Sequence, residues 1–503
     1  MYSKKRLIPA LIASLALLAL PSVSTAQKRI TKSDSLRQTA ASRAAPSLRS
    51  VESSGRTTAT RTKRDTWGDF AIADASEHPP LSDGTDILEW YRDRMVKNEP
   101  AGVADAGEPA LAAPFFTLNT TALYGSHAAP FQLQASGPSF SMEAFEQEIR
   151  DRVDGEVAGA VYALNLNGNF ARGDGIGFAR NSGDGFRSQS AFKRMNIASI
   201  SKTLTAVAVL RLLEENGLSV DSPIAPWLPE QWQLGLGFYD DGSQSTLTFR
   251  DLLTHRSGVA QSIPFFEEFD PNYAGKNYHF DGLKDLVEYG VLASQQGNYS
   301  YANANYALFR VMIPALWAAA GGIPADSELT ASDASAIYQA YMAVELFIPI
   351  GIHQATCDNS DEENRTLYYS AHEPNEAGTE TGNWNGFCGS GGWYLSAYDL
   401  ANVMAHMRYD DDYLSPAMRG QMDELLMGWS ENWSHDGAHG LYRAHAGALY
   451  LDERPAGERT EMQGCMMKFP IEVEATLMMN SSVIDEKNPC RILGQAFDAA
   501  WVN

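Results

Sequence analysis

Cysteine is scarce in this chain, with four residues among 503, at positions 357, 388, 465 and 490. None of them stands in a C-x-x-C pair or at zinc-ligand spacing from a histidine, which argues against a structural metal site. Four cysteines allow three disulfide pairings. We prefer the local pairing, Cys357 with Cys388 and Cys465 with Cys490, because it closes the shorter loops.

Basic residues are also few, with 39 Lys and Arg against 62 Asp and Glu and a formal net charge of −23. Such an acidic chain is a poor partner for nucleic acid, which attracts positively charged surfaces. Residues 28–64 are the exception, because they are basic and nearly free of large apolar side chains. This composition predicts a disordered, solvated tether; contact with anionic envelope surfaces is the alternative.

Long apolar runs are limited to Leu7–Leu20, which follows the basic residues 4–6 and precedes the small residues 24–26. This pattern predicts a secretory signal peptide over residues 1–26, because the apolar run is too short for a comfortable membrane span. No later segment has the length and apolarity of a transmembrane helix. We therefore expect an exported protein, periplasmic or secreted, without a transmembrane segment after signal removal.

The remainder of the chain divides by composition into three further parts. A basic linker is expected over 27–64, and an N-terminal extension of unassigned role over 65–138, with one amphipathic stretch at Asp86–Val96. The pattern of secondary structure becomes regular only afterwards. Residues 139–503 are therefore predicted to form the main domain.

The stretch Asn196–Thr203 leads into Leu204–Leu213, which is apolar on nearly every face and therefore predicts a buried helix ending at Gly217. Ser199 is expected at the N-terminal end of this helix, with Lys202 on the same face. A buried lysine amine loses its proton readily and can accept the proton of a serine hydroxyl. The pair thus predicts an activated nucleophile.

The S-x-x-K spacing alone is a weak signal, because it also occurs at Ser190 and Lys193. That second match lies in a polar stretch with no buried helix following it. Context therefore favours Ser199 over Ser190.

Strand and helix patterns occupy both ends of the main domain. They are a helix at 142–153 begun by Ser141, a strand at 160–166 with an Asn167-Gly168 hairpin turn, strands at 444–451, 461–468 and 472–479, and a helix at 489–501. The middle is mainly helical. This order predicts an α+β fold, with an antiparallel sheet built from both ends, flanked by helices, and an inserted helical subdomain.

Four further motifs follow Ser199 in order: Leu252–Val259 (LLTHRSGV), Tyr299–Tyr306 (YSYANANY), Gly389–Leu400 (GSGGWYLSAYDL) and His445–Gly447 (HAG). Together with Ser199 and Lys202 they resemble the serine β-lactamase-related family of class C β-lactamases, D-Ala-D-Ala carboxypeptidases, D-aminopeptidases and esterases, over about residues 140–502. The resemblance implies a β-lactamase/transpeptidase-like fold. A G-x-S-x-G elbow is absent, which argues against an α/β-hydrolase lipase.

The resemblance implies a proton relay of three residues. Ser199 is similar to the family nucleophile and Lys202 to its base. Tyr301, in the Y-x-N motif, is similar to the second member of the relay, and a neighbouring lysine is expected to lower its pKa. No metal or organic cofactor is implied.

The resemblance also implies a set of substrate-binding groups. Asn303 is expected to bind the amide or carbonyl of the substrate, and Gly447 to let the substrate lie close to a strand edge. The oxyanion hole is expected from the backbone N–H groups of Ser199 and Ala448. His445 stands where true β-lactamases usually have lysine, and a catalytic or binding role is expected for it.

Other motif residues favour structural roles. His255 is expected to hold a loop, Gly391-Gly392 to form a tight backbone wall, and Ser396 with Asp399 to cap a helix.

These observations predict an exported serine hydrolase that forms a covalent acyl-enzyme on an ester, a peptide or a cell-wall-derived small molecule, as an esterase or D-amino-acid peptidase. A β-lactamase is the first alternative, disfavoured because histidine at 445 lacks the fixed positive charge that suits a β-lactam carboxylate. A non-catalytic penicillin-recognising or peptidoglycan-binding protein is the second. An envelope scaffold that uses residues 28–138 is the third.

Overall fold

A computed structural model describes residues 139–232, 247–260, 279–289, 291, 295–323, 329–455, 458–483 and 488–502. The predicted signal peptide, basic linker and N-terminal extension, with its amphipathic stretch, lie outside the described residues.

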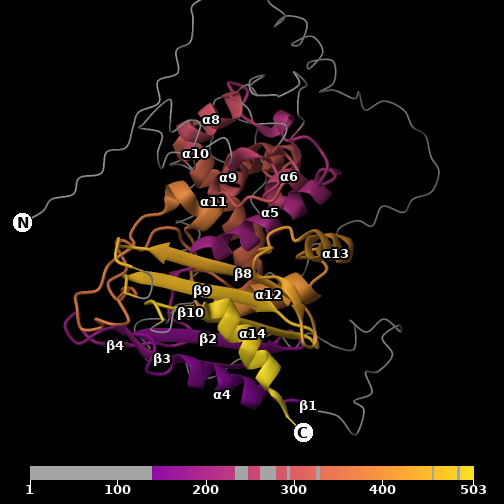
Figure 1. Cartoon of the computed structure of the whole chain (residues 1–503). Coiled ribbons are helices and arrows are strands. Elements are labelled where there is room, and N and C mark those ends of the chain that lie inside the picture. The colour runs from indigo at the N-terminus through magenta and orange to yellow at the C-terminus, as the bar shows by residue number, and fades with distance from the viewer. Residues whose placement is uncertain are drawn as a thin grey trace, which may run out of the picture. The chain divides into compact units, whose positions relative to one another are not determined.

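An antiparallel sheet of seven strands in the order β4-β3-β2-β10-β9-β8-β7 organises the described part of the chain (Figure 1). Its strands are β2 (Gly159–Leu166), β3 (Asn169–Arg180), β4 (Arg187–Ser188), β7 (His435–Gly437), β8 (Gly440–Tyr450), β9 (Glu461–Lys468) and β10 (Val473–Met479). β2 pairs with β10 from Leu166–Val473 to Ala160–Met479, which joins the two ends of the domain. The predicted sheet built from both ends is confirmed.

The β2–β3 hairpin turns where the sequence predicted it. Asn167 and Gly168 adopt φ values of 53° and 70°. Two consecutive left-handed residues match the twist of the flanking strands, and Asn-Gly is the pair that tolerates this conformation best.

Two short strand pairs lie outside the main sheet. β1 (Ser139–Phe140) pairs with β11 (Trp501–Val502), so the two ends of the domain meet. β5 (Met195–Asn196) pairs with β6 (Tyr394–Leu395). The second pair brings the Gly389–Leu400 motif beside the residues that lead into Ser199.

Helices cover both faces of the sheet. They are α4 (Met142–Val153), α5 (Ser201–Glu215), α6 (Phe249–Leu253), α8 (Phe280–Tyr289), α9 (Asn303–Ala319), α10 (Ala331–Tyr341), α11 (Cys388–Gly391), α12 (Ala397–Tyr409), α13 (Pro416–Leu425) and α14 (Pro489–Ala499). α4 and α14 pack together on one face, whereas α12 packs against β2 and β10 within the other core cluster. Figure 1 shows α5, α6 and α8–α11 gathered beside β8, as the inserted helical subdomain. Within the described ranges, no helix combines the length and apolarity needed to span a bilayer.

Helix boundaries follow the predicted caps closely. Ser141 Oγ accepts the N–H of Ala144 at the start of α4, and Ser396 with Asp399 forms a capping box at the start of α12. The larger differences in bounds lie at the C-terminal end. β8 begins at Gly440 instead of 444, because its first residues pair with β7, and α14 ends at Ala499, because the chain then enters β11.

α5 is buried on all sides, as its apolar composition predicted. Its threonines satisfy their hydroxyls inside the core, since Thr203 Oγ1 donates to the carbonyl of Gly428 at 2.7 Å and Thr205 Oγ1 to that of Gly389 at 2.8 Å. The helix starts at Ser201, and Ser199 lies in the preceding 3-10 turn, Ala198–Ile200. Ser199 therefore lies at the N-terminal end of the helix, as predicted, but in the turn that precedes the α-helix.

Both predicted disulfides are confirmed. Cys357 joins Cys388, and Cys465 joins Cys490. The first fastens a loop to α11 and the second fastens β9 to α14.

Candidate active site

The turn that carries Ser199 is held in a conformation that non-glycine residues rarely adopt. Ala198 has a φ of 46°, and such left-handed backbone costs an L-residue about 1–2 kcal/mol. The Asn196 side chain offsets this cost, because its Oδ1 accepts the N–H of Ala198 at 2.8 Å. The N–H of Ile197 donates to the carbonyl of Trp393 at 2.9 Å. The nucleophile thus sits on a turn fixed from both sides.

Lys202 lies within hydrogen-bond distance of three oxygens. Its Nζ is 3.0 Å from Ser199 Oγ and 2.8 Å from Asn303 Oδ1, and it contacts the carbonyl of Ser390. Burial holds the pKa of Lys202 well below its usual value, because charge is costly away from water. The neutral amine has two hydrogens, which suit Asn303 and Ser390, and one lone pair, which is left for the proton of Ser199.

Tyr301 also contacts Ser199. Its hydroxyl donates to Ser199 Oγ at 2.7 Å, and the side chain is 40% exposed. Burial of the hydroxyl end raises the pKa of Tyr301, and the hydrogen bond to Ser199 offsets this only in part. The expected lowering of its pKa by lysine is therefore wrong. The physical reason is that the neutral Lys202 provides no positive charge to stabilise a phenolate.

His255 holds the loop that carries Tyr301, as the sequence predicted. Its carbonyl accepts the N–H of Ser300 at 2.9 Å, and its Nδ1 accepts the N–H of Ala302 at 3.3 Å. Its ring lies against that of Tyr301, with centroids 4.5 Å apart. His255 therefore contacts the backbone of the residues before and after Tyr301 and also the ring of Tyr301.

Asn305 contacts the ring of His255, a role that was not predicted from the sequence. Its Nδ2 is 3.0 Å from His255 Nδ1, and its Oδ1 accepts the hydroxyl of Ser257 at 2.5 Å. Burial lowers the pKa of His255 well below its usual value, so this imidazole stays neutral. The second asparagine of the Y-x-N-x-N motif was the only sequence signal for this role.

Asn303 is exposed at the start of α9 and contacts Lys202. Its Oδ1 accepts a hydrogen of the Lys202 amine, so its Nδ2 is left for another acceptor. This arrangement is compatible with the predicted contact to a substrate carbonyl, which stays a prediction.

His445 is buried on β8 beside the relay. Its ring centroid lies 6.5 Å from that of Tyr301. Its Nδ1 donates to the carbonyl of Ala446 at 2.7 Å, so the neutral ring carries its proton there and leaves Nε2 as an acceptor. Burial lowers the pKa of His445 to about 3. His445 therefore provides no positive charge at neutral pH.

Gly447 lets β8 pass directly over the nucleophile turn. A Cβ atom at this position would lie 2.4 Å from the carbonyl oxygen of Ile197 and 3.3 Å from Ala198 Cβ. The family resemblance implied that this glycine makes room for substrate, whereas the structure shows a closer constraint from the protein itself. Packing against the Ser199 turn already requires glycine.

The register of β8 turns the N–H of Ala448 away from β9. The N–H of Leu451 donates to the carbonyl of Thr460 on the side of β9. In an antiparallel pair, the N–H groups of successive residues point alternately toward and away from the partner strand. Ala448 is three residues from Leu451, so its N–H points away from β9. Ala444, with the same parity, indeed bonds to Ser430 and Ser434 beyond the edge of the strand. β7 pairs with β8 only up to Tyr442. The N–H of Ala448 is therefore not used by β9, and its role as an oxyanion donor stays a prediction.

The competing pair, Ser190 and Lys193, lies in a tight turn closed by the N–H of Lys193 on the carbonyl of Ser190. No buried helix follows it, and the next strand is β5. The structure gives it none of the contacts seen at Ser199. Among the described residues, no group of three His, Cys, Asp or Glu side chains is placed to hold a metal ion.

Fold and site together define a class, the serine hydrolases of the β-lactamase fold. The family model described as Beta-lactamase matches residues 145–448, which is more than half of the 503 residues. The chain therefore belongs to the Beta-lactamase family. The predicted family and the β-lactamase/transpeptidase-like fold are confirmed.

Solved structures support the same fold at low sequence identity. The β-lactamase/D-alanine carboxypeptidase of Yersinia pestis aligns with a TM-score of 0.51 and 14% identity, over 71% of this chain and 99% of that one. The octameric penicillin-binding protein homologue of Pyrococcus abyssi aligns with a TM-score of 0.50 and 19% identity, over 70% and 75%.

Curated relatives match over shorter stretches. Esterase EstB of Burkholderia gladioli is 34% identical over 131 residues, covering 26% of this chain and 31% of that protein. The mouse mitochondrial serine β-lactamase-like protein LACTB is 30% identical over 140 residues, covering 27% and 24%. The aligned part thus spans a third or less of these relatives' own length.

Proposed function

We propose that this protein cleaves esters or amides that carry no charge next to the scissile bond, through an acyl-enzyme at Ser199. The observation that carries the proposal is the position of Ser199 Oγ, 3.0 Å from the Lys202 amine and 2.7 Å from the Tyr301 hydroxyl. A nucleophile with a neutral base and a separate proton donor has the groups that acyl transfer requires.

In the proposed acylation, Ser199 Oγ attacks the carbonyl carbon while its proton passes to Lys202 Nζ. The resulting oxyanion is held by the N–H groups of Ser199 and Ala448. The bond to the leaving group then breaks, and the leaving group takes the proton of Tyr301. The Lys202 ammonium returns a proton to Tyr301, and water releases the acyl group by the reverse sequence of proton transfers.

The preference for an uncharged substrate rests on the charges around Ser199. Burial lowers the pKa of Lys202, His255 and His445 and so disfavours the charged form of each. A substrate carboxylate would therefore meet no fixed positive charge from these three residues. The likeness to an esterase supports the same substrate class.

Export to the periplasm or the medium is part of the proposal. The two disulfides support it, because such bonds persist in oxidising compartments. The predicted leader over residues 1–26 supplies the route.

A substrate panel tests the proposal. The purified protein is assayed with a neutral aryl ester, an N-acylated D-amino-acid amide and a chromogenic cephalosporin, each also with Ser199→Ala and with Ser190→Ala as the matched control. We expect ester or amide hydrolysis that is lost only in Ser199→Ala, and slower turnover of the cephalosporin. Faster turnover of the cephalosporin would identify a β-lactamase, and binding of it without any turnover would identify a non-catalytic penicillin-recognising protein; both contradict the proposal.

A further inference from the structure

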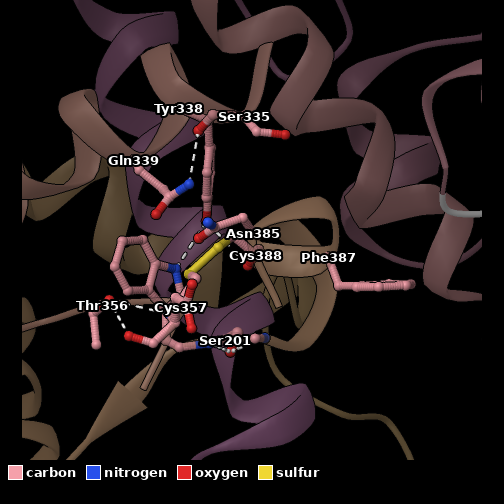
Figure 2. The surroundings of a disulfide bond; sticks show 12 residues. Ser201, Ser335, Tyr338, Gln339, Thr356, Cys357, Asn385, Phe387 and Cys388 are labelled. Carbon is pink, nitrogen blue, oxygen red and sulfur yellow. Dashed lines mark hydrogen bonds between the residues drawn. A yellow bond between two sulfur atoms is a disulfide. The ribbon is translucent and has the colours of Figure 1, made fainter. Parts of the chain in front are cut away.

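The disulfide Cys357–Cys388 holds the segment whose Ser390 carbonyl contacts Lys202. Cys388 is the first residue of α11, and both cysteines are fully buried. Figure 2 shows the bond with Ser201 of α5 and Tyr338 of α10 among its neighbours. The bond therefore joins the loop around Thr356 to a turn that contacts the active-site helix.

Consecutive carbonyl groups of α11 accept hydrogen bonds from α5. The carbonyl of Gly389 accepts from Thr205 Oγ1 at 2.8 Å, and that of Ser390 accepts from Lys202 Nζ. The following N–H groups, of Gly392 and Trp393, donate to Ser201 Oγ at 3.2 and 3.3 Å. The backbone of this short segment thus contacts one face of α5. It also provides one of the two acceptors of the Lys202 amine.

α11 is poorly able to hold its own shape. It has four residues, Cys-Gly-Ser-Gly, and glycine gains more freedom than any other residue when its structure loosens. Glycine cannot be replaced at 389, because a Cβ atom there would lie 2.9 Å from the carbonyl oxygen of Tyr306. Packing against Tyr306 therefore requires glycine at 389, although the carbonyl groups of Gly389 and Ser390 must be held in place.

The disulfide supplies the restraint that the glycines lack. It fixes the first residue of α11 to Cys357, whose carbonyl accepts the N–H of Trp384 at 2.7 Å. The hydroxyl of Tyr338 adds a second tie, 2.8 Å from Thr205 Oγ1 and 3.4 Å from the carbonyl of Cys388.

We propose that the Cys357–Cys388 disulfide is a positioning element of the catalytic machinery, which fixes the α11 backbone against Lys202 and keeps water away from its amine. The inference rests on the function proposed above for Lys202. Without the bond, α11 loosens, the amine becomes hydrated and then holds its proton more strongly. Fewer molecules at neutral pH would then carry a base able to accept the proton of Ser199.

The second disulfide is a matched control. Cys465–Cys490 closes a similar loop, of 25 residues against 31. It joins β9 to α14 within the core cluster on the face of the sheet away from Ser199. Its loss should lower stability to a similar degree without changing the surroundings of Lys202.

The experiment compares Cys357→Ala/Cys388→Ala with Cys465→Ala/Cys490→Ala in the exported, oxidised protein. The rate of Ser199 labelling by a fluorophosphonate is measured across pH, at a temperature where circular dichroism shows both variants folded. The titratable groups beside Lys202 are Tyr301, His255 and His445, and none is altered in either variant. We expect the acid limb of the first variant to move up by about one pH unit, so that labelling is about tenfold slower at pH values below the wild-type midpoint. The second variant should follow the wild-type curve.

Thr205→Val provides a test that leaves the disulfide intact. It removes the side-chain bond to the carbonyl of Gly389 and should move the acid limb in the same direction by a smaller amount. Equal pH curves for the wild type and Cys357→Ala/Cys388→Ala, or equal shifts in both disulfide variants, overturn the inference. If Cys357→Ala/Cys388→Ala does not fold, an unshifted Thr205→Val curve overturns it instead. Absence of labelling at Ser199 in the wild type would instead contradict the proposed function.

Discussion

At the scale of single residues, the proposed mechanism makes the reactivity of Ser199 depend on the charge of Lys202. The neutral amine is the active form, and burial keeps its pKa well below the usual lysine value. Activity is therefore expected at neutral pH and should fall as acid protonates the amine. The midpoint of the acid limb of kcat/KM measures the pKa of Lys202 in the free enzyme.

Lys202→Arg should remove the base while keeping a basic side chain at this position. Arginine stays protonated at every accessible pH, so it cannot accept the proton of Ser199. We expect kcat to fall by about 10³-fold, within the range of general base catalysis. Steady-state hydrolysis of the best ester measures this, and activity within a few-fold of the wild type would rule out Lys202 as the base.

Tyr301→Phe removes a proton donor while its ring can stay against His255. We expect kcat to fall by about 10²-fold with little change in KM, because the hydroxyl is needed when the leaving group departs. Because the pKa of Tyr301 is raised, its ionisation should not limit activity until above pH 10, the ordinary tyrosine value. Stopped-flow measurement with two esters of different leaving-group pKa is the test, and equal rates for the variant and the wild type would contradict it.

At the scale of secondary-structure elements, the contact between β8 and the Ser199 turn requires a glycine. Gly447→Ala would place a Cβ atom 2.4 Å from the carbonyl oxygen of Ile197, so the strand or the turn must move. We expect a loss of about 1–3 kcal/mol in the free energy of unfolding, as for overpacking elsewhere, and a large loss of activity.

Gly494→Ala is the control for this change. Nothing lies within 4 Å of a Cβ atom at this position in α14, so alanine should stabilise the helix by about 0.5–1 kcal/mol. Urea unfolding and hydrolysis are measured for both variants. A Gly447→Ala protein with wild-type activity would show that the β8 contact does not position the nucleophile.

The elements and the site differ in how far the sequence could predict them. Ser199 and Lys202 lie within one turn of chain, so periodicity alone brought them together. Tyr301 lies 102 residues from Ser199, and only the motif resemblance predicted their contact. The carbonyl of Ser390 had no sequence signal, because every residue carries the same carbonyl group. The predicted lowering of the Tyr301 pKa was wrong because it required a positive charge on Lys202, and burial disfavours that charge.

At the scale of the whole molecule, buried neutral histidines predict sensitivity to acid. His445 has its pKa lowered to about 3, whereas an unfolded chain has a histidine pKa of about 6.5. Between these values the unfolded state binds more protons, so lowering the pH favours unfolding. Each such group contributes up to about 1.4 kcal/mol per pH unit in this window.

His445→Asn removes one of these groups and keeps a donor for the carbonyl of Ala446. We expect the free energy of unfolding of the variant to fall less steeply than that of the wild type as the pH is lowered through this window. The remaining slope includes His255, whose pKa is also lowered. Urea titrations at several pH values compare the slopes, and identical slopes would mean that His445 is not buried as a neutral ring.

The most direct test of the central claim is mass-spectrometric mapping of the protein after reaction with a fluorophosphonate. The account predicts one covalent adduct, on Ser199, which disappears in Ser199→Ala, persists in Ser190→Ala and forms slowly in Lys202→Arg. An adduct on Ser190 or another residue, or no adduct on Ser199 in the folded protein, would contradict it.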